Sequence, residues 1–163
     1  MPVRRRRNRR NIVAIPPASN PTPVGEKYTR SYWENKFKIS PVTYKAQDGN
    51  PRDVRTFIFD RSFILEWIVR KYKLKGKTHE DTMYKCCNFV QDSITYKSDS
   101  DTHSQNEFWQ NPEDTLARGT GDCEDGAILM KSLSLIAGVP DWKCKIVAGM
   151  VRGGGHAYCT FIR

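Results

Sequence analysis

The stretch RGTGDCEDGA, residues 118–127, predicts the centre of the fold. It is a glycine-rich turn that runs into a cysteine, and an apolar run from residue 127 to residue 136 follows it. Glycine is favoured just after the end of a helix and proline cannot continue one, so Gly138-Val139-Pro140 should end that run. Cys123 is therefore expected in the first turn of a helix.

A cysteine in the first turn of a helix is a candidate nucleophile. Unpaired backbone N–H groups and the positive end of the helix dipole favour an anion there, so the pKa of the thiol is expected to fall. A histidine that opens a short strand follows in GGGHAY, residues 153–158. Cys123 and His156 are thus the two parts that a thiol acyl-transfer site needs. The acids beside Cys123 are expected to cap the helix, because a neighbouring acid opposes the fall in the pKa of a thiol.

The composition fits a single folded domain that follows a basic arm. Hydrophobic residues make up 38% of the 163 residues, which is enough for one modest core. The formal net charge is +9, and arginines among the first ten residues supply six of those charges. Prolines at positions 16, 17, 21 and 23 favour extended backbone, so we expect an arm over residues 1–30 and a domain over residues 31–163.

The arm carries the charge that a binding partner would meet. We expect it to bind an acidic protein surface, a nucleic acid or an anionic membrane surface, and a solvated tail is the alternative. Binding to nucleic acid would be driven by the phosphate backbone and sensitive to salt, because the domain shows no base-reading motif. The residues of the arm that we expect to bind are Arg4, Arg5, Arg6, Arg7, Arg9 and Arg10.

Cysteine spacing and hydropathy exclude several classes of protein. The five cysteines form no CxxC pair and the three histidines are scattered, so we expect no disulfide framework, no metal site and no cofactor. No apolar run reaches the roughly 20 residues of a membrane span. The basic N-terminus is followed by prolines and not by an apolar segment, which argues against a secretory signal peptide. A reducing compartment is the expected location.

Helical spacing of apolar residues predicts two helices ahead of the cysteine helix. The first should span residues 61–73 with Asp60 as its N-cap, and the second should span residues 79–96 after Thr78. The cysteines of the second helix are expected to be buried thiols that pack the core. The expected buried faces are Phe63, Ile64, Trp67 and Ile68 in the first helix, and Met83, Cys86, Cys87, Val90 and Ile94 in the second.

Shorter elements complete the expected domain. A strand is predicted over residues 54–59 and a short helix over residues 111–116, where a proline opens the first turn. After the cysteine helix, residues 142–151 should form a largely buried strand. A turn at residues 152–155 should then return the chain in an antiparallel strand over residues 156–162.

Taken together, these motifs resemble the transglutaminase-like superfamily, and the match is best to its bacterial and phage members of the cysteine-peptidase type. The resemblance covers residues 61–163 and rests on NPEDTL at 111–116, GDCED at 121–125, AGVP at 137–140 and GHA at 155–157. It implies an α+β fold with a papain- or transglutaminase-like core, in which helices pack on a small antiparallel sheet. The extended N-terminal arm precedes this core.

The resemblance also implies which residues form the site. The family's nucleophile corresponds to Cys123 and its histidine base to His156. The backbone N–H of the cysteine would stabilise the oxyanion, and Gln110 or Trp109 is the expected additional donor.

The residue that orients the catalytic histidine in the family is missing from its usual position in this sequence. The family holds its histidine with an aspartate or asparagine on the strand that follows. This sequence continues for seven residues after His156, and none of them is an acid or an amide. We therefore expect a domain truncated after the histidine strand, without the third triad member, and Asp122, Asp125 or a partner chain is the candidate to replace it.

Three hypotheses for function follow. The first is a component of a large assembly, such as a phage virion, that keeps the transglutaminase-like fold and a Cys–His thiol acyl-transfer site, with neighbouring protein subunits as partners. The alternative is an active cysteine peptidase or transglutaminase-like enzyme that uses Cys123 and His156. The third is a nucleic-acid-binding protein that acts through the basic arm. The expected location is a virion or the cytoplasm.

Overall fold

The computed structural model describes residues 43–45, 49–100, 108–152 and 154–163. The arm expected over residues 1–30, with the six arginines of its first ten residues, lies outside the described residues. Its extended form and the start of the domain at residue 31 therefore stay predictions.

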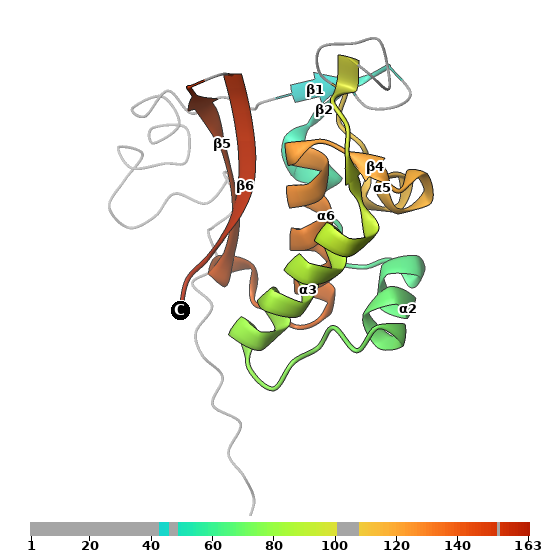
Figure 1. The fold of residues 1–163 in the computed structure, drawn as a ribbon, viewed down its shortest axis with the longest axis vertical. Coiled ribbons are helices and arrows are strands. Elements are labelled where there is room, and N and C mark those ends of the chain that lie inside the picture. The colour runs from blue at the N-terminus through green and yellow to red at the C-terminus, as the bar shows by residue number, and fades with distance from the viewer. Residues whose placement is uncertain (1–42, 46–48, 101–107, 153) are drawn as a thin grey trace, which may run out of the picture. The chain divides into compact units, whose positions relative to one another are not determined.

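Helix α6, Cys123–Ile136, lies at the centre of the described domain (Figure 1). It begins at the predicted cysteine and contacts three other helices and the hairpin formed by the last two strands. Leu129 and Leu133 are fully buried within it. The helix ends where the sequence predicts, because Gly138 takes a φ of 98° that an L side chain rarely adopts.

Among the described elements, three helices pack against α6: α2 at Phe63–Lys71, α3 at His79–Ser93 and α5 at Pro112–Arg118. Helix α5 starts with a proline in its first turn, as predicted. Helix α3 starts after Thr78, which also agrees with the prediction. The side chain of Thr78 accepts a hydrogen bond from the backbone N–H of Asp81 at 3.1 Å, which satisfies one of the free groups at the helix start.

Helix α2 is shorter than predicted, and of the four residues expected on its buried face only Ile68 is buried. Its N-cap is Ser62, which accepts a hydrogen bond from a backbone N–H at 3.1 Å, and not Asp60. Apolar residues occur on two sides of this helix, so helical spacing alone fits two faces, and packing against the rest of the core selects between them. The buried residues are Leu65, Ile68 and Val69, and the exposed apolar residues are Phe63, Ile64 and Trp67.

Helix α3 ends at Ser93, three residues before its predicted end, because the chain then enters a short parallel sheet. In that sheet β3, Thr95–Tyr96, pairs with β4, Thr120–Gly121. The pairing sets the glycine turn of residues 118–121 beside the end of α3. Cys86 is fully buried, as predicted, and Cys87 is half-buried.

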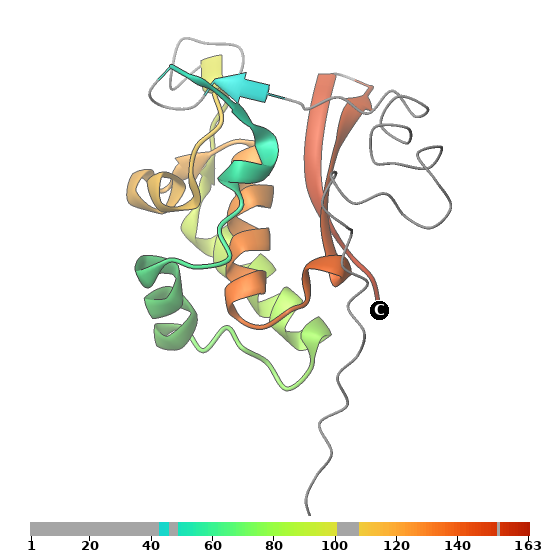
Figure 2. The ribbon, with the colours of Figure 1, turned by 180° about the vertical axis from the view of Figure 1, so that it is seen from behind.

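Strands β5, Cys144–Val151, and β6, Gly154–Phe161, form the antiparallel hairpin that the sequence predicts. The hairpin lies beside α6 from both sides of the molecule (Figures 1 and 2). Strand β5 begins two residues later than predicted, since the 3-10 helix η3, Asp141–Lys143, precedes it. The prediction of a largely buried strand is wrong. Only Cys144 of β5 is fully buried and Ile146 is half-buried, while residues 147–151 are exposed on both faces of the strand.

The first described elements are short. Strands β1, Thr43–Lys45, and β2, Pro51–Asp53, form an antiparallel pair. The strand predicted over residues 54–59 is instead the 3-10 helix η2, Val54–Phe57, followed by extended chain. Asp53 accounts for the difference, because its carboxylate accepts a hydrogen bond from the backbone N–H two residues later and turns the chain.

The described elements form an α+β domain with small sheets and with helices packed around α6, as the sequence predicts. Its largest core cluster joins α2, α3 and α6. None of the helices in the described part of the chain has the length and apolar character of a membrane span.

Candidate active site

Cys123 is the first residue of α6, and the two residues before it set its position. Gly121 has no room for a side chain, because an added Cβ would lie 2.8 Å from the Cβ of Asp125. Asp122 is the N-cap and is extended, although its side chain makes no capping hydrogen bond. The turn thus brings the cysteine to the end of α6 where backbone N–H groups lack helical partners.

The sulfur of Cys123 contacts groups from α6 and from β6. The thiol donates a hydrogen bond to Oε2 of Glu124 at 3.3 Å. The backbone N–H of Ala157 on β6 lies near the sulfur and lowers the pKa of the thiol. The sulfur is therefore held between the first turn of α6 and the strand that carries His156.

The pKa of the Cys123 thiol is raised to about 11, so the predicted fall in pKa does not occur. Burial is the largest cause, because it penalises the charged thiolate. The N–H of Ala157 acts in the opposite direction, while the hydrogen bond and charge of Glu124 and the charge of Asp122 raise the pKa further. Burial and the neighbouring acids outweigh the N–H of Ala157, and the resting residue is a neutral thiol.

The peptide bond that follows His156 lies near the sulfur, whereas the His156 ring stacks on Tyr158. The N–H that reaches Cys123 belongs to the peptide bond between His156 and Ala157. Ala157 is buried, and the thiol of Cys159 donates a hydrogen bond to the backbone carbonyl of Ala127 in α6 at 3.1 Å. Side chains alternate along a strand, so His156 and Tyr158 share the other face, where their rings stack with centroids 6.0 Å apart. Among the hydrogen bonds of the described residues, none joins the His156 ring to Cys123.

Gln110 and Asp125 fasten the segment before α5 to α6. Asp125 is fully buried, and its Oδ1 accepts a hydrogen bond from the backbone N–H of Gln110 at 2.8 Å. The Gln110 side-chain Nε2 donates to Oδ2 of Asp125 and to the carbonyl of Thr120. Sequence reasoning missed this pair because its members lie 15 positions apart, and the final aspartate of GDCED was its only local signal.

Trp109 supports the same segment from its apolar side. It is almost fully buried, and its ring meets the ring of Phe57 in an edge contact with centroids 5.7 Å apart. Ile128 of α6 belongs to the same cluster. Gln110 and Trp109 thus hold the chain against the first half of α6, and the oxyanion role expected for them stays a prediction.

Two carboxyl groups flank the cysteine. Burial, followed by the hydrogen bond to Glu124, raises the pKa of Asp122 to about 8. Burial also raises the pKa of Glu124. Each group has one buried oxygen without a hydrogen-bond partner among the described residues, Oδ1 in Asp122 and Oε1 in Glu124. The site therefore holds at least one proton on its acids near neutral pH.

The same acids are the described residues that could hold a cation. Asp122, Cys123 and Glu124 offer ligand atoms within 4.8 Å of one another, as do Asp99, Asp122 and Asp125. Carboxylate oxygens suit hard divalent cations. The expectation of no metal and no cofactor stays a prediction.

Comparison with known families identifies the superfamily of the chain. A family model described as the Transglutaminase-like superfamily matches residues 68–162. The chain belongs to this superfamily. The match confirms the resemblance seen in the sequence, and it includes both Cys123 and His156. No curated protein shows significant similarity to the chain.

Proposed function

We propose that this transglutaminase-like domain carries out thiol acyl transfer at Cys123. The observation that supports the proposal is that the backbone N–H of Ala157 lies close enough to the Cys123 sulfur to lower the pKa of the thiol. It sets the first turn of α6 beside the peptide bond that follows His156. A nucleophile and a base from these two positions match the pair that thiol catalysis needs.

The neutral thiol determines how the reaction starts. A thiol with a pKa of about 11 keeps its proton at neutral pH, so His156 accepts that proton as the sulfur attacks. The imidazole must first leave its stack on Tyr158. Because the ring lies on the face of β6 away from α6, this end of the hairpin also has to twist to bring it to the sulfur. Catalytic groups of unliganded sites often lie further apart than in the complex with substrate, which fits a histidine that moves when substrate binds.

Acyl transfer then takes two steps. The sulfur attacks a carboxamide or peptide carbonyl and forms a thioester, and His156 passes the proton to the leaving amine. Transfer of the acyl group to another amine is transamidation, and transfer to water is hydrolysis. The Cys123 N–H is the first oxyanion donor, with Gln110 and Trp109 as the further candidates. Because Asp125 already binds Gln110, Asp122 is the better candidate to orient the histidine.

Alkylation of Cys123 at neutral pH tests the proposed dyad. A neutral thiol without a base reacts slowly with iodoacetamide, so fast labelling at pH 7 has to depend on His156. We expect His156→Ala to slow labelling of Cys123 by about tenfold or more, as measured by peptide mass spectrometry. Thr160→Ala, a substitution on the same strand, is the control and should leave the rate unchanged. Equal rates in His156→Ala and the wild type would contradict the proposal.

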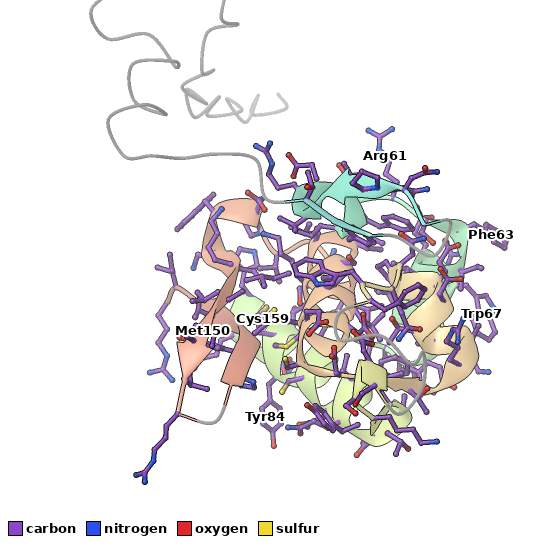
Figure 3. All side chains as sticks on the ribbon, turned by 90° about the horizontal axis from the view of Figure 1, so that it is seen from above. Arg61, Phe63, Trp67, Tyr84, Met150 and Cys159 are labelled. Carbon is purple, nitrogen blue, oxygen red and sulfur yellow. The ribbon has the colours of Figure 1, made fainter. Side chains whose placement is uncertain are left out.

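A second proposal is that the domain is a component of a larger assembly. Large apolar side chains are exposed on α2, where Phe63 is 80% and Trp67 45% exposed, and on β5, where Met150 is 84% exposed (Figure 3). Exposed apolar surface favours contact with another protein. The arginines at residues 4–10 add an arm suited to acidic surfaces of neighbouring subunits, as in a virion, or to nucleic acid.

Sedimentation velocity over a range of protein concentrations tests assembly. The full chain should associate as its concentration rises, and the Phe63→Ser/Trp67→Ser double variant should associate less. A monomer at every concentration would contradict self-assembly through this surface.

Binding of the arm to duplex DNA has a different signature. The logarithm of the association constant should fall linearly with the logarithm of the salt concentration.

A further inference from the structure

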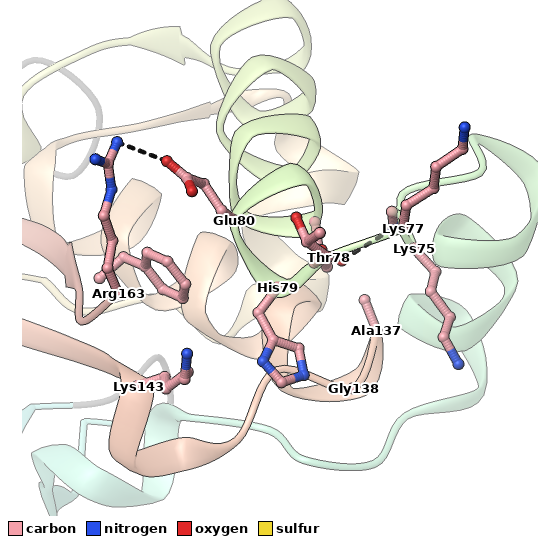
Figure 4. Close-up of a pocket in the computed structure, with 12 residues that line it drawn as sticks. Lys75, Lys77, Thr78, His79, Glu80, Ala137, Gly138, Lys143 and Arg163 are labelled. Carbon is pink, nitrogen blue, oxygen red and sulfur yellow. Dashed lines mark hydrogen bonds and ion pairs between the residues drawn. The ribbon is translucent and has the colours of Figure 1, made fainter.

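We propose that a second site, a basic pocket at the start of α3, binds a polyphosphate group such as that of a nucleoside triphosphate. The pocket has a volume of about 550 Å³ and is lined by the segment that leads into α3, by the residues after α6 and by η3 and the end of β6 (Figure 4). This volume is in the range of small-molecule sites. The lining includes no residue of the Cys123 site, so the proposal goes beyond acyl transfer.

The side chains that line the pocket carry an excess of positive charge. Lys75, Lys77, Lys143 and Arg163 contribute four positive charges and Glu80 one negative charge, which gives a net charge of +3. Arg163 is already paired, because its guanidinium contacts the Glu80 carboxylate at 2.6 Å. Within the described part of the chain, the three lysines take part in no ion pair. They are therefore available to an anion.

Acids at the start of α3 form their closest contacts with other groups, although the charge of Lys77 also contributes to the lowered pKa of Asp81. Glu80 pairs with Arg163, as stated. Asp81 accepts a hydrogen bond from the backbone N–H of Lys77 at 2.9 Å and contacts Lys85, one turn further along α3, at 3.3 Å. Both acids of the first turn thus have other partners. The attraction for an anion comes from the lysine ammonium groups.

The cations lie on two sides of the pocket. Lys143 and Arg163 lie on one side and Lys75 and Lys77 on the other, with His79 between them (Figure 4). The ammonium groups of Lys75 and Lys77 point away from His79, so they have to turn inward to meet a ligand. The pocket is much larger than one phosphate ion, so a single phosphate could not meet both sides. A chain of phosphate groups carries charge along its length and can meet both. Lysine binds phosphate as a point charge on a flexible stem, so the ammonium groups can turn to such a ligand.

Apolar surface beside the lysines suits the rest of a nucleotide. Phe161 and Ala137 line the pocket together with the charged residues. The Nζ of Lys143 lies 5.4 Å from the centroid of the Phe161 ring. An aromatic ring next to a cation can receive a flat base while the cation meets a phosphate. This favours a nucleoside triphosphate over a simple inorganic anion.

Isothermal titration calorimetry of the full chain with ATP and with inorganic tripolyphosphate, at constant ionic strength, tests the proposal. The Lys77→Gln/Lys143→Gln double variant removes one ammonium group from each side of the pocket. We expect it to weaken the binding of both ligands by about tenfold or more. The Lys71→Gln/Lys97→Gln double variant removes the same charge outside the pocket and should bind as the wild type does.

The comparison of the two double variants separates the pocket from the basic arm, since both variants keep the arm. Unchanged affinity in Lys77→Gln/Lys143→Gln, or an equal loss in the control, would assign binding to charge elsewhere and overturn the proposal. The absence of binding to either ligand would overturn it as well. None of these results would affect the proposal for Cys123, because neither lysine belongs to that site.

Discussion

At the scale of single residues, the protonation state of Cys123 depends on a competition between the start of the helix and the surroundings of the thiol. The helix end and the N–H of Ala157 favour a thiolate, whereas burial and the carboxyl groups of Asp122 and Glu124 favour the neutral thiol. Burial and the acids prevail. The glycine turn predicted the position of the cysteine. The protonation state of the thiol could not be predicted, because its burial depends on β6, which lies far away in the sequence.

Glu124→Gln should lower the pKa of Cys123. The substitution removes a neighbouring carboxylate while burial remains, so the pKa should fall part of the way from about 11 towards 9.0. The wild-type thiol keeps its proton until the pH approaches 11, so the thiolate of the variant should form at lower pH. The rate of alkylation at Cys123, followed across pH by peptide mass spectrometry, measures the shift.

Glu66→Gln is the matched control for that titration. Glu66 is an exposed acid on α2, and its loss removes the same charge without changing the surroundings of the sulfur. The alkylation profile of Glu66→Gln should follow that of the wild type. A Glu124→Gln variant with the wild-type profile would show that the acid does not hold the thiol neutral.

At the scale of elements, the turn between β4 and α6 depends on a contact that local sequence does not reveal. The glycines and the cysteine predicted the turn and the helix. The link between Gln110 and Asp125 was not predicted, because it joins α6 to a segment that precedes α5. It also explains why Gly121 has to be glycine, since a Cβ there would meet Asp125.

Gly121→Ala should therefore destabilise the domain. An added Cβ 2.8 Å from the Cβ of Asp125 forces the turn or the helix to move, and we expect a loss of about 1–3 kcal/mol. Gly126→Ala makes the same change on α6, where the nearest atom lies 3.9 Å from the added Cβ. There alanine should stabilise the helix by about 0.5–1 kcal/mol. Urea denaturation measures both, and equal effects would contradict this account of the turn.

Helix α2 shows a second limit of pattern reasoning. Apolar spacing predicted the helix, but apolar residues on two sides made its buried face ambiguous. The packing of Leu65 in the cluster with α6 resolves it, and that packing is a property of the fold and not of the segment.

Two substitutions on α2 distinguish its faces. Leu65→Ala removes a side chain with 0% exposure and should cost about 2–5 kcal/mol. Ile64→Ala, at a position 47% exposed, should cost less than about 1 kcal/mol. Thermal or urea unfolding of the two variants provides the comparison. A larger loss in Ile64→Ala would restore the face that the spacing alone predicted.

At the scale of the whole molecule, α6 connects the two proposed sites. Cys123 is its first residue, and Ala137 and Gly138, which line the basic pocket, follow its last turn. A helix of 14 residues spans about 20 Å, so the sites can be altered separately. The superfamily and the α+β class could be predicted from motifs at residues 111–116, 121–125 and 155–157. The pocket could not, because it joins segments that are distant in the sequence.

Formation of an acyl-enzyme tests the central claim most directly. The full chain is incubated with an activated ester such as p-nitrophenyl acetate, and intact mass with peptide mapping locates the acetyl group. We predict a single acetyl group on Cys123 in the wild type, none at that position in Cys123→Ser, and formation about a hundredfold slower in His156→Ala. Acetylation of Cys123 at the wild-type rate without His156, or no acetylation of Cys123 in the wild type, would contradict the proposed dyad.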